Sequence, residues 1–320
     1  MSRSTAARAA MMVLLVLVTA CGGGTGATDA AEQESAAAPS PTAGESAGFP
    51  VTVEAANGAV TLNAPPASIV SLSPTATEML FAIGAGDQTV AVDRFSTYPS
   101  EAPATDLSAL EPNIEAIASY EPDLVVFAED PGDLTSSLED LDIPALSFPA
   151  ATTLDDTYAQ IGQLGAATGH AEDADALVEQ MRNDIDKIVA DAPTAAEGVT
   201  FYHELDNTYY SVTSETFIGQ LYDMLGLRNI ADEAPEDAGG YPQLSSEFIV
   251  DANPDLIFLA DTRCCGQSLE TVAQRPGWAQ VDAVTNDAVI ELDDDVASRW
   301  GPRVVDLLRT IADAVETSRS

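Results

Sequence analysis

Two serines stand at the end of a short apolar run, a place where hydrolases can carry a hydroxyl nucleophile. The stretch 68–80 reads SIVSLSPTATEML, so a β-branched run ends in Ser71 and Ser73 and passes directly into a proline. Proline is tolerated in the first turn of a helix, which predicts a strand followed at once by a helix. Thr75 and Glu78 also fit a capping box, in which a hydroxyl and a carboxylate accept hydrogen bonds from free backbone N–H groups. The serines could be a nucleophile, part of a phosphate loop, or the wall of a binding cleft.

The rest of the chain argues against catalysis by these serines. A serine nucleophile needs a general base and an oxyanion hole, but no Gly-x-Ser-x-Gly elbow occurs in the sequence. The only two histidines, His170 and His203, fall at a helix junction and within a predicted strand, where structural roles are more common. A phosphate loop would need a glycine-rich run followed by lysine, and none is found. We therefore interpret the turn at Ser73 as cleft wall and predict no catalytic residues.

Aromatic and arginine side chains follow several predicted strands, and ligands of open α/β sheets bind at the carboxyl ends of the strands. Aromatic rings on several loops suit a large, flat, partly apolar ligand, while the arginines, rare in this chain, suit an anionic one. The alternative is that Tyr98, Trp300 and one of Tyr209 and Tyr210 anchor their loops to the core. The predicted ligand-binding residues are Ser73, Arg94, Phe95, Tyr98, Tyr209, Tyr210, Tyr241, Arg263, Arg299 and Trp300.

Cys264 and Cys265 are adjacent and follow a predicted buried strand. In an oxidising compartment they could form a vicinal disulfide, and free thiols or a soft-metal contact are the alternatives. A dedicated zinc or manganese site would need several histidine and carboxylate ligands that converge. We expect neither such a metal site nor a resident cofactor.

Short β-rich runs alternate with helical patterns, which predicts an α/β fold of two lobes, each with a mainly parallel sheet flanked by helices. Between the lobes, apolar residues recur at helical spacing over 170–192 and Pro193 ends the run, which predicts one long connecting helix. The predicted strands lie at 68–73, 89–93, 124–129, 145–149, 199–205, 256–261 and 288–292.

The two halves also share a detailed pattern. The segments NIEAIASYEPDLVVFA and SSEFIVDANPDLIFLA align at a constant offset of 132 residues, which pairs Glu115 with Glu247. Each copy predicts a short helix that opens with a glutamate, a Pro-Asp turn and a buried strand. A carboxylate in the first turn of a helix is stabilised by the helix dipole, which is the simple explanation for each glutamate alone. As a matched pair near the carboxyl edges of the sheets, they predict a two-point docking surface for a partner with two-fold symmetry.

Length and charge limit the possible functions. A chain of 320 residues with 46% hydrophobic content favours two domains with sizeable cores. It has 12 basic and 52 acidic residues and a formal charge of −40, so nucleic acid is excluded as a partner. Because the acidic residues are spread along the chain, we interpret them as a solvated surface that keeps the protein soluble.

The N-terminus predicts export. Arg3 and Arg8 precede the apolar run AAMMVLLVLVTAC, which is short for a membrane span and typical of a signal peptide. The run ends in a stretch that resembles the lipobox of bacterial lipoproteins, which predicts acylation of Cys21 and an extracytoplasmic protein held to the membrane by lipid alone. The alternative is an ordinary secretory signal with an unrelated cysteine. The predicted domains are a signal peptide (1–20), a lipid-anchored disordered linker (21–48), an N-terminal lobe (49–169), the interlobe helix (170–192) and a C-terminal lobe (193–320).

Taken together, these features resemble the substrate-binding proteins of bacterial ABC importers for metal chelates, the cobalamin and ferric-siderophore group with a helix between the lobes. The Ser-Leu-Ser-Pro turn and the Ser-x-Tyr-Pro loop look more like cobalamin binders than siderophore binders. Cobalamin binders often place tryptophan at two positions where Ala109 and Tyr241 stand here. The matching stretches are SIVSLSPTATEMLFAIGAGD, STYPSEA, NIEAIASYEPDLVV, GGYPQLSSEFIVDANPDLIF and ASRWGPRVVDLL.

The resemblance implies a monomeric binding protein, with no enzymatic activity, that holds a cobalt or iron chelate in a cleft between two lobes. It also implies little hinge motion and delivery of the chelate to a permease dimer with its ATPase. In the family, one glutamate on each lobe pairs with permease arginines, and the matching positions are Glu115 and Glu247. Cobalamin is the expected ligand, with a ferric siderophore or haem as the alternative. A secreted α/β hydrolase and a sensor or adhesion lipoprotein are the other classes that we consider.

Overall fold

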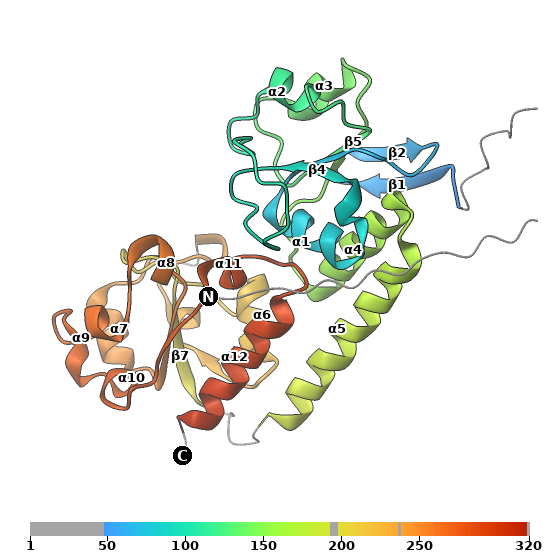
Figure 1. The fold of residues 1–320 in the computed structure, drawn as a ribbon. Helices are drawn as coiled ribbons and strands as arrows, with labels where there is room; N and C mark the ends of the chain where they lie inside the picture. Colours follow the sequence, from blue (N-terminus) through green and yellow to red (C-terminus); the bar gives the residue numbers. More distant parts are fainter. Residues whose placement is uncertain (1–47, 193–197, 236–237, 319–320) are drawn as a thin grey trace, which may run out of the picture. The chain divides into compact units, whose positions relative to one another are not determined.

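The structure, a computed structural model, describes residues 48–192, 198–235 and 238–318. The predicted signal peptide, Cys21 and the linker up to residue 47 lie outside the described residues. The described part has an α/β fold with two four-stranded parallel sheets and one small antiparallel sheet, which confirms the predicted fold class (Figure 1). All seven predicted strands are present, each shortened by a residue or two at its ends.

The first parallel sheet has the order β4-β3-β5-β6, with β3 at Ile69–Leu72, β4 at Thr89–Val92, β5 at Leu124–Phe127 and β6 at Ala145–Ser147. Strands β3 and β5 are buried along their whole length, as expected for parallel strands covered by helices on both faces. The helices of this lobe are α1 (Pro74–Ala82), α2 (Ile114–Ala118), α3 (Leu134–Glu139) and α4 (Leu154–Thr168).

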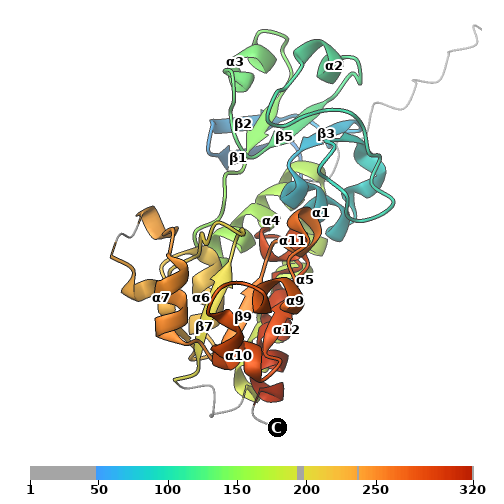
Figure 2. The ribbon, with the colours of Figure 1, turned by 90° about the vertical axis from the view of Figure 1, so that its left-hand side faces the viewer.

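The second parallel sheet has the order β10-β9-β7-β8, with β7 at Thr200–Glu204, β8 at Arg228–Asn229, β9 at Leu256–Leu259 and β10 at Val289–Glu291. Its helices include α6 (Phe217–Asp223), α7 (Ser246–Ala252), α8 (Thr262–Cys265), α9 (Leu269–Ala273), α10 (Asp282–Thr285), α11 (Asp294–Ala297) and α12 (Val304–Thr317). Figure 2 shows α7 and α10 beside the strands of this sheet. The two copies of the internal repeat therefore form α2-β5 and α7-β9, one in each sheet.

His203 lies in β7 and is fully buried, consistent with a structural histidine. Its Nδ1 lies 2.8 Å from the hydroxyl of Tyr222, and the Tyr222 ring stacks on Phe201 with ring centroids 4.0 Å apart. Burial lowers the pKa of His203 to about 4, so the ring is neutral at physiological pH. His170 lies at the start of the long helix α5 (Ala171–Asp191), where its Nε2 is 3.0 Å from Oε1 of Gln88.

A β-hairpin that we did not predict precedes the first sheet. Strands β1 (Val51–Ala55) and β2 (Gly58–Leu62) pair antiparallel through a two-residue turn at Ala56 and Asn57. Asn-Gly between two alternating runs is a strong signal for a tight hairpin, so the sequence did contain the information. The Asn57 side chain ties the turn to β6, since its Nδ2 donates to the carbonyl of Ala145 at 2.9 Å.

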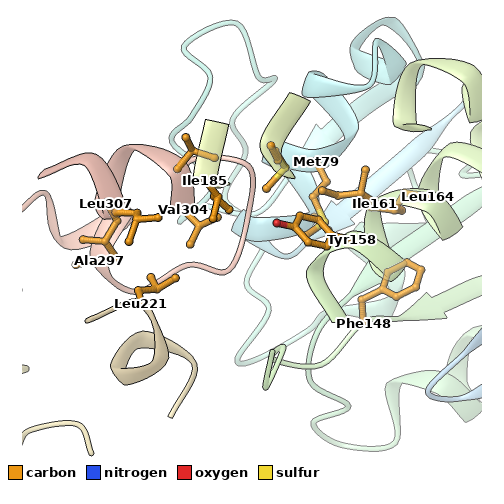
Figure 3. Close-up of a cluster of buried hydrophobic side chains, with 14 of the residues drawn as sticks. Met79, Phe148, Tyr158, Ile161, Leu164, Ile185, Leu221, Ala297, Val304 and Leu307 are labelled. Atoms are coloured by element: carbon orange, nitrogen blue, oxygen red, sulfur yellow. The ribbon is translucent and has the colours of Figure 1, made fainter. Parts of the chain in front are cut away.

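The predicted long helix is confirmed as α5, but it does not join the lobes by itself. Buried residues of α4, α5 and α12 belong to the same hydrophobic cluster as residues from both parallel sheets. Figure 3 shows part of this cluster, with Tyr158 and Ile161 of α4, Ile185 of α5 and Val304 of α12 among its labelled side chains. A continuous apolar core therefore supports the connection between the sheets. As a separate point, none of the described helices combines the length and apolar character that crossing a bilayer requires.

The close approach of α4 and α5 depends on a glycine, which allows a direct test. A Cβ added to Gly165 would lie 2.4 Å from the Cβ of Ala174, whereas one added to Gly162 would meet nothing within 4 Å. We expect Gly165→Ala to lower the free energy of unfolding by about 1–3 kcal/mol through overpacking. The control Gly162→Ala, on the same helix, should raise it by roughly 0.5–1 kcal/mol, because alanine favours the helix more than glycine. Urea unfolding followed by circular dichroism measures both, and equal effects would show that the two helices can separate without cost.

Candidate functional site

The serine-rich end of β3 is a buried hydroxyl network. Ser73, not Thr75, is the N-cap of α1, and its Oγ accepts from the N–H of Ala76 at 3.2 Å. Thr77 Oγ1 lies 2.9 Å from Oγ of Ser71 and 3.1 Å from Oγ of Ser96. The network thus ties the strand end to the helix and to the loop after β4. Ser73 is only 2% exposed, so its hydroxyl serves as the helix cap inside this network and is not presented at the surface.

The predicted capping box is therefore wrong, because the helix begins at Pro74 and Glu78 lies inside it. Proline at the first helical position moves the helix start two residues earlier than predicted. Glu78 then lies inside the helix, where its carboxylate accepts from Nη1 of Arg299 at 2.8 Å and from Nε of Arg303 at 2.9 Å. Its side chain is 1% exposed. A carboxylate of the first lobe is therefore buried against two arginines that follow the second sheet.

Asp295 completes this group, because its carboxylate accepts from Nη2 of Arg299 at 2.6 Å. We call Glu78, Asp295, Arg299 and Arg303 the interlobe charge cluster. Two carboxylates balance two guanidinium groups, which is what burial of charge requires. The hydrogen bond with Glu78 raises the pKa of Arg303, so this guanidinium remains charged at physiological pH.

The interlobe charge cluster also fixes the loop that follows β4. Arg299 donates to the carbonyl of Phe95 at 3.0 Å, and Thr97 Oγ1 lies 3.1 Å from Oδ2 of Asp295. The guanidinium of Arg303 lies 4.2 Å from the centre of the Tyr98 ring, within range of a cation–π interaction. The loop that carries three predicted ligand-binding residues is therefore held by side chains from the other lobe.

Four predicted aromatic residues are accessible at strand ends. The exposed fractions are 46% for Phe95, 47% for Tyr98, 40% for Tyr210 and 44% for Tyr241. Arg94 lies over the Phe95 ring, 4.9 Å from its centre. In the second lobe, a β-bridge between Tyr210 and Gln243 brings the Tyr241 segment alongside the loop after β7. Both lobes therefore present aromatic surface after the carboxyl ends of their strands.

Other predicted residues are held within the protein. Tyr209 stacks on the buried Trp278 with ring centroids 5.8 Å apart, and Trp300 donates from Nε1 to Oε1 of Gln160 on α4 at 2.9 Å. Tyr209 and Trp300 thus match the loop-anchoring alternative, and Arg299 is taken up by the interlobe charge cluster. Arg263 is exposed and pairs with Asp293 at 3.1 Å.

The second lobe also contains a buried acidic group that we did not predict. Glu204 at the end of β7 is paired with Arg275 through two bonds of 2.6 Å. Asp261, two residues beyond β9, is fully buried and neither carboxylate oxygen has a hydrogen-bond partner. Burial and then the charge of Glu204 raise the pKa of Asp261 to about 7. Within the described ranges, no group of three or more histidine, cysteine or acidic side chains is arranged to hold a metal ion.

The predicted docking glutamates occupy equivalent positions in the two repeats. Glu115 is in the first turn of α2, capped by Asn113, and Glu247 is in the first turn of α7, capped by Ser245. Both are exposed. Each helix runs antiparallel to the following strand, so both glutamates lie toward the carboxyl edge of their own sheet.

Comparison with known proteins identifies the family of this chain. Residues 69–296 match the family model described as periplasmic binding protein. The ABC transporter substrate-binding lipoprotein YvrC of Bacillus subtilis is 32% identical over 83% of this chain and 86% of its own length. The cobalamin-binding protein of Halobacterium salinarum is 30% identical over 83% of this chain and 74% of its own length.

The fold is also found among solved structures. The periplasmic haem-binding protein RhuT of Roseiflexus superposes with a TM-score of 0.70 at 22% identity, over 79% of this chain and 99% of that protein. At this identity the likeness concerns the fold. With two parallel sheets, a connecting helix and a family match that covers most of the chain, this protein belongs to the periplasmic binding protein family of ABC importers.

Proposed function

We propose that this protein captures a cobalamin-like metal chelate outside the cytoplasm and delivers it to an ABC permease. Membership of a family of transport binding proteins means that the protein is not an enzyme, and a secreted hydrolase is not supported. The observation that carries the proposed ligand class is the exposed aromatic surface after strand ends in both lobes, from Phe95 and Tyr98 in one and Tyr210 and Tyr241 in the other. A broad corrinoid ring can be covered by such rings from two sides.

Cobalamin is favoured over other chelates because a relative with 30% identity over 83% of this chain is a cobalamin-binding protein. Haem is the second candidate, supported by the shared fold with a haem-binding protein. Three arginines were expected to suit an anionic siderophore: Arg94, Arg263 and Arg299. Arg263 is already paired with Asp293, and Arg299 with Glu78 and Asp295. These pairings make a siderophore the weaker alternative.

We further propose a lipid anchor at Cys21 followed by a flexible linker, so that the binding protein reaches a permease from the same membrane. The relative YvrC is a lipoprotein, which supports this assignment. The anchor is tested by membrane fractionation of the Cys21→Ala variant, which should leave the membrane fraction.

Calorimetric titration with cobalamin, haem and several ferric siderophores tests the ligand. We expect cobalamin to bind most tightly, and Tyr241→Ala to weaken it by about 1–3 kcal/mol through loss of aromatic contact area. The matched control is Tyr120→Ala, because Tyr120 is also an exposed tyrosine but lies just beyond α2, beside the amino end of β3 and away from the carboxyl ends of the strands. Tighter binding of haem, or equal losses in the two variants, would contradict the assignment.

Permease docking is tested with Glu115 and Glu247. If each carboxylate meets a permease arginine, charge-assisted bonds at the interface should make each glutamate contribute on the order of 2–5 kcal/mol to docking. The variant Glu115→Ala/Glu247→Ala should bind the chelate normally yet fail to stimulate the transporter's ATPase in reconstituted membranes. The control is Glu139→Ala, which removes an exposed glutamate at the end of α3. Wild-type stimulation by the double variant would disprove two-point docking.

A further inference from the structure

Cys264 and Cys265 form an exposed disulfide in the one-turn helix α8, directly after the buried strand β9. Because the cysteines are consecutive, their Cα atoms are only 3.8 Å apart. Ordinary disulfides join residues whose Cα atoms are roughly 4.4 Å or more apart, so this small ring is strained. Strained and exposed disulfides have the more oxidising potentials and are the ones that thiols reduce most readily. The transport function proposed above gives this bond no role.

We propose that the Cys264–Cys265 pair is a redox modification site for a dithiol reductant, and that its reduction loosens the hold of the second lobe on the first. The reaction is thiol–disulfide exchange. One thiolate of the reductant attacks a protein sulfur, the S–S bond breaks and the neighbouring cysteine leaves as a thiolate. The second thiol of the reductant then attacks the mixed disulfide and releases the other cysteine. Two electrons and two protons pass to the protein, and the reductant becomes a disulfide.

The first connection from this site runs through Asp294. Its carboxylate accepts from the backbone N–H groups of Thr262 at 2.9 Å, Arg263 at 3.0 Å and Cys264 at 2.8 Å. Burial alone would raise the pKa of Asp294, but these donors outweigh burial and lower it. The amides of the helix that contains the disulfide therefore hold Asp294 at the start of α11.

The second connection runs from α11 to the other lobe. Asp293 and Asp295, on either side of Asp294, both pair with Arg263, the residue before the disulfide, at 3.1 and 3.8 Å. Asp295 in turn pairs with Arg299 at 2.6 Å and contacts Thr97 of the first lobe at 3.1 Å. A continuous set of hydrogen bonds and ion pairs thus joins the disulfide to the interlobe charge cluster.

Reduction changes what keeps α8 in place. The closed ring limits the backbone freedom of both cysteines, and a single turn of helix has little stability of its own. When the ring opens, the N–H groups of α8 lose part of their fixed orientation toward Asp294. The acidic residues of α11 then hold Arg299 and the loop at Thr97 less firmly. This consequence does not depend on which chelate the protein binds, because it concerns contacts within the chain.

Hydrogen–deuterium exchange of the full-length protein, with and without dithiothreitol, tests the proposal. Thiol titration should show two new thiols after reduction. Amide exchange should become about tenfold faster at 262–265 and at 294–297, while α5 remains unchanged. The variant Cys264→Ser/Cys265→Ser should exchange like the reduced protein, whether or not dithiothreitol is present.

Two results would overturn the proposal. If no thiols appear under native conditions, the pair is a structural disulfide and not a modification site. If thiols appear but exchange at 294–297 stays constant, reduction does not reach the interlobe contacts. Should the serine variant fail to fold, the comparison of the oxidised and reduced wild-type protein decides the question alone.

Discussion

A buried carboxylate between two arginines sets the relation between the two sheets. Glu78 and Arg299 are both nearly inaccessible to solvent, and their separation of 2.8 Å leaves no room for water between them. Desolvating a charge is costly unless its partners are in place, so loss of either Glu78 or Arg299 leaves the interlobe charge cluster with one unbalanced charge. The apolar cluster shared by α4, α5 and α12 holds the two lobes together, but apolar contacts are non-directional and do not fix the orientation of the lobes. The directional bonds of the interlobe charge cluster fix that orientation, and they determine where the loop at Phe95 lies.

This arrangement connects fold to function. The aromatic residues proposed to cover the chelate lie on loops, which depend on their neighbours for position. Phe95 is held through its carbonyl by Arg299, and Tyr98 through its ring by Arg303. In the second lobe, Tyr209 is fixed against Trp278, next to the accessible Tyr210. A binding site formed by preorganised loops loses less entropy when it takes up a rigid ligand.

Much of the fold could be predicted because strong local signals agreed with it. Buried parallel strands appear as short apolar runs, and the alignment of the segments around Glu115 and Glu247 predicted the same helix-turn-strand unit in both lobes. The site was harder, because the partners of a polar side chain are distant in sequence. Glu78 fitted a local capping pattern in the sequence. Its place among apolar residues of a helix also fits a buried ion pair, and Arg299 and Arg303, four residues apart, are suitable partners. The partial burial of Trp300 against α4 and the full burial of Asp261 likewise depend on tertiary packing.

The most direct test of this account is a double-mutant cycle on Glu78 and Arg299, with Glu78→Gln and Arg299→Met measured singly and together by urea unfolding. If the interlobe charge cluster holds the sheets together, each single variant should lose about 3–5 kcal/mol of unfolding free energy, because each leaves the cluster with one unbalanced charge. The double variant should lose less than the sum, with a coupling energy on the order of 1–3 kcal/mol. Additive losses, within about 0.5 kcal/mol, would show that the pair acts independently and would contradict the account.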